Sequence, residues 1–343
     1  MGATLVDRPA VPTVTPPPTR RRGGTGRLVV RYLVTLLGVV TLVFAIPRAM
    51  PGDPLGALLQ DEAGTEQLDQ SREVLAEHYG LDRPLAEQYV RYLTDVARAD
   101  LGRSIANGQP VSRTIRDRLP WTLLLVGTAL ALSAAVSFVA GVGAAWRRGR
   151  LGDRVTTSVV TVLGAAPEYA VATILLILFA GTFQWFPVAG ASTPYNDFGL
   201  VSKVVDVVKH LVLPATALAL SLIGVKFLLV RNAVIGILGQ DYMVAARAKG
   251  LTEDRRKYRH AGRNALVPFL NIVAVQVGVA IGGALFVEQV FSYPGLASVM
   301  MPAVTRLDYP LIEGCFLVVA FVAVTANLVV DLVSARIDPR VGR

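Results

Sequence analysis

Residues 120–146 read PWTLLLVGTALALSAAVSFVAGVGAAW, a stretch without a single acidic or basic side chain. A helix rises 1.5 Å per residue, so about 20 residues cross a hydrocarbon layer of about 30 Å. The apolar residues form a continuous run instead of alternating with polar ones, which argues against a strand of a membrane barrel. This stretch therefore predicts a transmembrane helix.

Five further apolar runs lie on either side of it, at 29–48, 155–184, 211–237, 265–287 and 311–333. Each is long enough to cross a membrane, and the run at 155–184 is interrupted by Pro167 and Glu168. Only helices or closed barrels satisfy their backbone hydrogen bonds within lipid. The sequence thus predicts an all-α, polytopic membrane protein with six transmembrane helices.

The composition agrees with this prediction and excludes other classes. Hydrophobic residues make up 53% of the chain and charged residues 17%, against about 25% charged in soluble domains. The net charge of +9 could indicate nucleic-acid binding, but the basic residues flank the apolar runs, as they do in cytoplasmic loops. We expect lipid contact and no nucleic-acid partner.

The metal-ligating residue types are sparse. The single cysteine, Cys315, lies within an apolar run and cannot form an intrachain disulfide. The histidines His78, His210 and His260 are scattered, without the spacing of a metal site. We therefore expect no metal site and no cofactor in this chain.

The distribution of basic residues predicts the orientation. Arginines and lysines concentrate before the first run, after the second and fourth, and at the C-terminus, whereas 185–210 and 288–310 hold few. The positive-inside rule then places both termini in the cytoplasm. We expect 1–27, rich in Pro, Thr and Arg, to be a disordered cytoplasmic tail. The membrane domain is 28–343, with 49–119 as an extracytoplasmic segment that holds short amphipathic helices at 71–79 and 85–97.

The loop at 238–264, between the fourth and fifth runs, carries the most specific pattern, DYMVAARAKGL at 241–251. Asp241 is a candidate helix N-cap and Gly250 a candidate helix stop, and a second short helix would begin near Thr252. The small side chains of Ala245 and Ala246 would let another surface approach closely. The alternative is a basic, solvated loop without a partner.

This loop resembles the signature loop of binding-protein-dependent ABC importer permeases, most closely the dipeptide, oligopeptide and nickel branch. The pattern is Ala-Ala-x-x-x-Gly at 245–250, followed by RNALVP at 263–268. Further matching phrases occur in order: PGDP at 51–54, YGLDRP at 79–84, VEQVF at 287–291, PGL at 294–296 and DYP at 308–310. The resemblance covers about 28–343. It departs from the wider family at Val244, where that family has a glutamate.

The resemblance implies a permease subunit of the cytoplasmic membrane that imports peptides or related small solutes by alternating access. It implies four partners in the complex: a second homologous permease, two ATP-binding subunits that bind ATP and Mg, and an extracytoplasmic substrate-binding protein. The chain contains no Gly-Lys dipeptide and hence no phosphate loop, so we expect no enzyme activity of its own. The residues expected to couple to the ATP-binding subunits are Asp241, Ala245, Ala246, Arg247, Lys249, Gly250 and Leu251.

Polar residues within apolar runs are costly in lipid and therefore are candidates for function. Glu168 could line the substrate pathway, or it could pair with Lys226 or Arg231. Asn271 and Gln276 could line the same pathway or join helices through hydrogen bonds. A second set is expected near an outer gate: Glu288, Phe291 and Pro294.

Two other functions compete with the importer subunit. A stand-alone secondary transporter or channel predicts inverted repeats with helices broken in matching places, and the break at Pro167 has no convincing twin in the sequence. A membrane-embedded enzyme is disfavoured because no catalytic constellation is present. The substrate stays open among dipeptides, oligopeptides, glutathione and nickel complexes.

Overall fold

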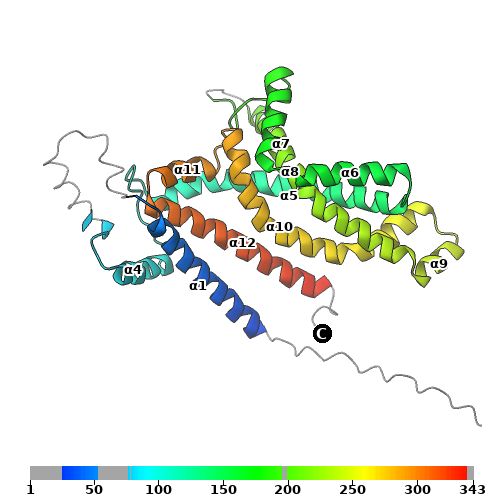
Figure 1. Ribbon diagram of the computed structural model, residues 1–343, viewed down its shortest axis with the longest axis horizontal. Coiled ribbons are helices and arrows are strands. Elements are labelled where there is room, and N and C mark those ends of the chain that lie inside the picture. Colours follow the sequence, from blue (N-terminus) through cyan, green and yellow to red (C-terminus); the bar gives the residue numbers. More distant parts are fainter. Residues whose placement is uncertain (1–24, 53–75, 78, 195–198, 338–343) are drawn as a thin grey trace, which may run out of the picture.

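The computed structural model describes residues 25–52, 76–77, 79–194 and 199–337, and the regular elements in these ranges are all helices (Figure 1). The early part of the chain forms α1 (Thr25–Ala49), α4 (Leu85–Ala97), α5 (Val111–Trp146), α6 (Leu151–Ala165), α7 (Glu168–Leu175) and the π-helix η1 (Leu176–Thr182). The later part forms α8 (Leu200–Leu238), α9 (Asp241–Ala248), the π-helix η2 (Arg255–Gly262), α10 (Arg263–Val290), α11 (Ala297–Thr305) and α12 (Tyr309–Ile337).

Among the described residues, five helices are long and apolar enough to cross a membrane, namely α1, α5, α8, α10 and α12. The third apolar run forms α6 and then α7 with η1, which meet at a bend of 103°, and counting this pair as one broken span gives six. The bend lies at Ala166, which is extended, and at Pro167. Proline lacks a backbone N–H and disfavours helical geometry in the residue before it. The prediction of an all-α polytopic membrane protein is confirmed.

Two spans extend well beyond their apolar runs. Helix α5 begins at Val111 instead of residue 120, and α8 begins at Leu200 instead of residue 211. A helix can continue beyond the hydrocarbon layer into a stretch with charged side chains, although the apolar run in the sequence stops there. Pro120, the predicted start of the second run, consequently lies inside α5, and Pro214 lies inside α8.

Helix α8 is the centre of the bundle and packs against α5, α6, α7 and α10. Small residues set the closest approaches: a Cβ on Gly164 would lie 2.8 Å from the Cα of Gly224, and one on Gly141 would lie 2.9 Å from the Val230 side chain. Such small-residue contacts are how helices pack closely in lipid, where no hydrophobic force drives them together. The glycines therefore hold α5 and α6 against α8.

The two ends of the bundle carry different elements (Figure 1). Helices α4 and α11 lie at one end, and α9 with η2 lies at the opposite end. That 49–119 and 238–264 lie on opposite sides of the membrane stays a prediction. Helix α4 confirms the helix predicted at 85–97, whereas the predicted tail up to residue 24 and most of the predicted helix at 71–79 lie outside the described residues.

Candidate functional site

The loop that joins α8 to α10, called the coupling loop (238–264), begins with α9. The prediction that Asp241 is the N-cap of this helix is wrong: the N-cap is Gln240, without a capping side-chain hydrogen bond, and Asp241 lies in the first turn. A carboxylate there still interacts favourably with the exposed N–H groups of the helix start.

Gly250 ends α9, as predicted. Its φ is +70°, in the left-handed region that glycine adopts without strain. Its backbone N–H donates to the carbonyl of Arg247 (3.0 Å), and that of Leu251 donates to the carbonyl of Ala246 (3.4 Å). These hydrogen bonds close the last turn of the helix and reverse the chain.

The predicted coupling residues divide between two faces of α9. Ala246 and its neighbour Met243 are buried, and Met243 packs among Val234 and Ala261 beneath the helix. Leu251 is half-buried, and the exposed members are Asp241, Ala245, Arg247, Lys249 and Gly250. Ala246 therefore anchors α9 on the bundle, while the other face is open to a partner.

The second half of the coupling loop differs from the prediction of a separate short helix. The stretch Arg255–Gly262 is a π-helix that continues directly into α10. Gly262 lies against the Phe138 ring of α5, and Asn264 donates a hydrogen bond of 2.6 Å to the Tyr242 hydroxyl of α9. The loop is thus one rigid unit with the ends of α5, α8 and α10.

An ion pair that the sequence did not reveal supports this end of the bundle. Arg231 of α8 donates two hydrogen bonds to Asp153 of α6, at 2.7 and 2.8 Å. Asp153 also accepts from the backbone N–H of Gly149. Asp153 could have been noticed as the lone acid within a run of arginines.

The polar residues inside the spans mostly join helices. Lys226 is fully buried and donates to the Ser133 hydroxyl (2.7 Å), while Gln276 donates to the carbonyl of Leu222 (3.3 Å). Gln276 thus makes the helix-joining contact that we considered as an alternative. Glu168 begins α7 and is half-buried.

Neither of the two pairings expected for Glu168 forms. Lys226 binds Ser133, and Arg231 binds Asp153. Asn271 is exposed on α10, one of the helices next to α8. Glu168, Asn271 and Gln276 stay candidates for the substrate pathway.

The residues predicted for the outer gate lie at the end of α10 and the start of α11. Glu288 and Phe291 are buried, and Pro294 is half-buried. The Glu288 carboxylate accepts hydrogen bonds from the Thr122 hydroxyl (2.6 Å) and from the backbone N–H of Ala297 (2.8 Å). This carboxylate therefore ties α10 to α5 and to the first turn of α11.

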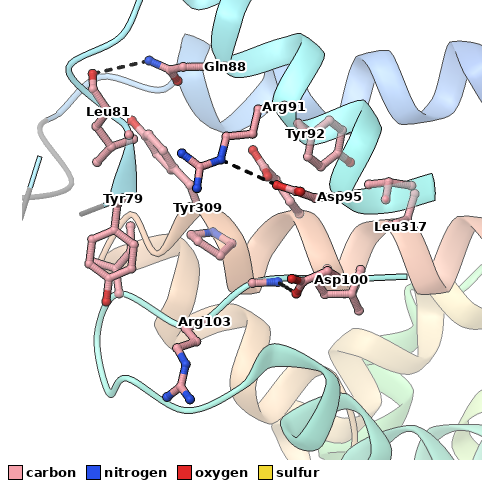
Figure 2. A pocket seen from close by; sticks show the side chains of 18 of the residues that line it. Tyr79, Leu81, Gln88, Arg91, Tyr92, Asp95, Asp100, Arg103, Tyr309 and Leu317 are labelled. Atoms are coloured by element: carbon pink, nitrogen blue, oxygen red, sulfur yellow. Dashed lines mark hydrogen bonds and ion pairs between the residues drawn. The ribbon is translucent and has the colours of Figure 1, made fainter. Parts of the chain in front are cut away.

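Between α4, the loop at 98–110 and the start of α12 lies a pocket of about 360 Å³ (Figure 2). Tyr92 of α4 lines it with a buried hydroxyl that has no hydrogen-bond partner among the described residues. Burial, reinforced by the nearby Glu313 carboxylate, raises the pKa of this phenol. Two carboxylates join distant segments of the chain at this end of the bundle, and one of them, Glu313, lines the pocket.

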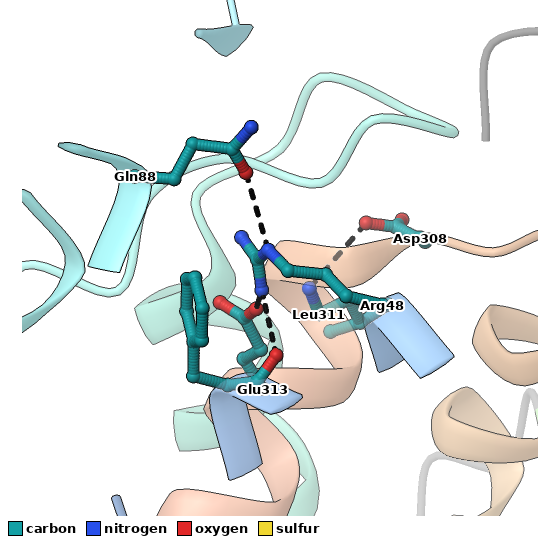
Figure 3. Close-up of polar contacts among 6 residues, drawn as sticks. Arg48, Gln88, Asp308, Leu311 and Glu313 are labelled. Atoms are coloured by element: carbon teal, nitrogen blue, oxygen red, sulfur yellow. Dashed lines mark hydrogen bonds and ion pairs between the residues drawn. The ribbon is translucent and has the colours of Figure 1, made fainter. Parts of the chain in front are cut away.

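Figure 3 shows these two carboxylates. Glu313 of α12 pairs with Arg48 of α1, which also donates to the Gln88 side chain of α4 (3.2 Å). Asp308 accepts from the Ser104 hydroxyl and from the Ile105 backbone N–H (3.0 Å), which holds the loop at 98–110 against α12. Such pairings across distant segments carry no signal in a single sequence.

Comparison with known proteins fits this bundle and its loop. Residues 137–343 match the family model described as "Binding-protein-dependent transport system inner membrane component". Residues 26–126 match the N-terminal model of the same membrane component. The chain is 36% identical over 309 residues to the oligopeptide transport system permease protein AppB of Bacillus subtilis, covering 89% of this chain and 95% of that protein. It is 34% identical over 322 residues to the di/tripeptide transport system permease protein DppB of Pseudomonas aeruginosa, covering 90% and 95%.

The apolar helices and the family match define a membrane-embedded, multi-pass component of a transport system. The chain belongs to the family of inner membrane components of binding-protein-dependent transport systems, the permeases of ABC importers. Both matches together cover nearly the whole described bundle, including α9 and Gly250. The findings support this class and do not support a stand-alone transporter or channel.

Proposed function

We propose that this chain imports di- or oligopeptides as one permease subunit of an ABC importer. The support comes from the relatives AppB and DppB, whose names specify oligopeptide and di/tripeptide transport. The single observation that carries the proposal is the family match that includes the rigid coupling loop at one end of the bundle. Glutathione and nickel complexes are the alternatives that a substrate assay must exclude.

The complex that we propose contains a second homologous permease, two ATP-binding subunits and an extracytoplasmic binding protein. The exposed positions of Ala245, Arg247 and Lys249 support docking of an ATP-binding subunit at α9, and no atom lies within 4 Å of a Cβ added at Gly250. ATP and Mg bind to those subunits, and this chain supplies no catalytic group.

The proposed mechanism is alternating access. ATP-driven closure of the ATP-binding subunits moves the coupling loop, and the helices that it joins rock as rigid bodies. The direct continuation of η2 into α10 supports such transmission, since force on the loop reaches a transmembrane helix without an intervening flexible link. Glu168, at the break between α6 and α7, is the residue that we propose to meet a peptide amino group.

The test has two parts. In a host that lacks peptide uptake, the chain and its partners should restore ATP-dependent uptake of a labelled tripeptide, and free nickel should not compete.

The orientation is tested with single cysteines at exposed positions, Val244→Cys on α9 and Val90→Cys on α4. A membrane-impermeant thiol reagent should label the α4 position in intact cells and the α9 position only in inverted vesicles prepared without the ATP-binding subunits.

The native Cys315 is buried and provides the background control. Labelling of the α9 cysteine from outside, or uptake that persists without ATP-binding subunits, would contradict the proposal.

A further inference from the structure

A hollow of about 380 Å³ opens at the loop end of the bundle, between α9 and η2. It is lined by the apolar Trp146, Leu238 and Met243, by the exposed Val244, Arg247 and Glu253 at its rim, and by the half-buried Arg256. A hollow of this size accommodates one or two side chains of another protein. It lies beside the exposed face of α9.

Arg256 is the unusual member of this hollow. Its guanidinium carbon lies 5.8 Å from the centroid of the Trp146 ring, so the aromatic face supports one side of the cation. Its Nε is buried and has no hydrogen-bond partner among the described residues. None of the ion pairs among the described residues includes Arg256, although Glu253 lines the same hollow.

The buried Nε–H of Arg256 thus lacks a hydrogen-bond acceptor in the described part of the chain. A buried donor without an acceptor is costly, and a guanidinium binds a carboxylate through two parallel hydrogen bonds. Val244, at the rim, is 65% exposed and offers no carboxylate. The described residues supply no acceptor to this guanidinium, and a carboxylate of a partner protein would supply one.

The charge around the hollow specifies the chemistry of that acceptor. The coupling loop carries an excess of basic side chains: Arg247, Lys249, Arg255, Arg256, Lys257, Arg259 and Arg263, against Asp241, Glu253 and Asp254. A partner surface that meets this potential must be acidic, because like charges across an interface are strongly disfavoured.

We propose that the hollow between α9 and η2 receives an aspartate or glutamate side chain of the ATP-binding subunit, whose carboxylate binds the Arg256 guanidinium. Val244 and the apolar wall then pack against the stem of the inserted side chain. This inference rests on the proposed function, because it requires an ATP-binding subunit at the coupling loop.

The test measures the affinity of the purified ATP-binding subunits for the permease pair in lipid nanodiscs. Arg256→Gln should weaken binding about 30-fold, as expected for truncating one partner of a buried charge pair. The matched control is Arg255→Gln, which removes the same charge from the adjacent, exposed position. It should weaken binding less than about threefold, as a rim charge does.

Each acidic residue on the docking face of the ATP-binding subunit is then neutralised in turn. One of them should weaken binding in the wild-type background and have no further effect with Arg256→Gln. Exchange of the two charges, Arg256→Glu with that acid changed to arginine, should restore binding. Equal effects of Arg255→Gln and Arg256→Gln, or the absence of any coupled acid, would overturn the inference.

Two further results separate the possible failures. If Arg256→Gln lowers the thermal stability of the permease pair itself, the charge exchange still decides, because restored binding requires a direct contact. If the wild-type pair binds no ATP-binding subunit, the proposed function fails together with the inference. If the wild-type pair binds and only the coupling to Arg256 is missing, the proposed function stands without it.

Discussion

The Arg231 guanidinium of α8 donates two hydrogen bonds to the Asp153 carboxylate of α6, Nε to Oδ1 at 2.7 Å and Nη2 to Oδ2 at 2.8 Å. The Asp153 side chain is 3% exposed and the Arg231 side chain 19%. The pair lies near the loop end of the bundle, where α6 begins and α8 approaches the coupling loop. It fixes the start of the broken third span to the central helix.

Asp153→Ala should destabilise the permease by about 2–3 kcal/mol, because it leaves the Arg231 guanidinium mostly buried and unpaired. The measurement is the unfolding of the purified permease in detergent. The matched control is Asp254→Asn, an exposed carboxylate in the coupling loop, which should change stability by less than about 0.5 kcal/mol. The double change Asp153→Leu with Arg231→Met should recover most of the loss, and a double variant as unstable as Asp153→Ala would refute this account.

Lys226 differs from Arg231, because this buried cation donates to the neutral hydroxyl of Ser133 and not to a carboxylate. Lys226→Met should leave the unfolding temperature unchanged or higher, because an apolar side chain of similar length fills the space without a desolvated charge. Ser133 keeps a hydrogen bond to the Leu130 carbonyl (3.1 Å) in that variant. Ser133→Ala should lower the unfolding temperature, since it removes the acceptor at 2.7 Å from the Lys226 ammonium.

The test compares the unfolding temperatures of the Lys226→Met and Ser133→Ala variants. If Lys226→Met destabilises the protein as much as Ser133→Ala does, the ammonium contributes to folding in a way that its hydroxyl contact does not explain. Peptide uptake by the Lys226→Met variant, measured alongside, separates a folding role from a role in transport.

Position 295 requires glycine because no side chain fits there. A Cβ at this position would overlap the Glu288 carboxylate, so Gly295→Ala should push that carboxylate away from Thr122 and from the backbone N–H of Ala297. Loss of these buried hydrogen bonds should cost about 2–4 kcal/mol and reduce the folded protein recovered from membranes. Gly282→Ala, on α10 with no atom within 4 Å of the added carbon, should be harmless. Equal recovery of both variants would show that α11 does not depend on this contact.

Local composition was enough to predict the spans and several loop features. Uninterrupted apolar runs revealed the spans, and the amphipathic pattern at 85–97 revealed α4 with its observed bounds. Gly250 was found because a helix end that needs a positive φ selects for glycine. These features depend only on neighbours in the chain.

Features that depend on distant partners could not be predicted. Glu168 was considered a partner of Lys226 or Arg231, but the choice between Asp153 and Glu168 depends on where α6 ends and bends. Proline indicated a break, yet the bend of 103° is set by how α6 and α7 pack on α8. The burial of Glu288 likewise depends on α11 folding back over it.

The coupling role proposed for Gly250 leads to a prediction about transport itself. Its φ of +70° costs a side chain about 1 kcal/mol for alanine and about 2 kcal/mol or more for a β-branched residue. No atom lies within 4 Å of an added Cβ, so Gly250→Val should act through the backbone and deform the turn after α9. The expected result is preserved assembly with several-fold fewer peptides imported per ATP hydrolysed, measured in proteoliposomes. Gly250→Asn, which tolerates the left-handed region, should stay close to wild type. Full coupling in the Gly250→Val variant would show that the shape of this turn does not transmit the motion of the ATP-binding subunits.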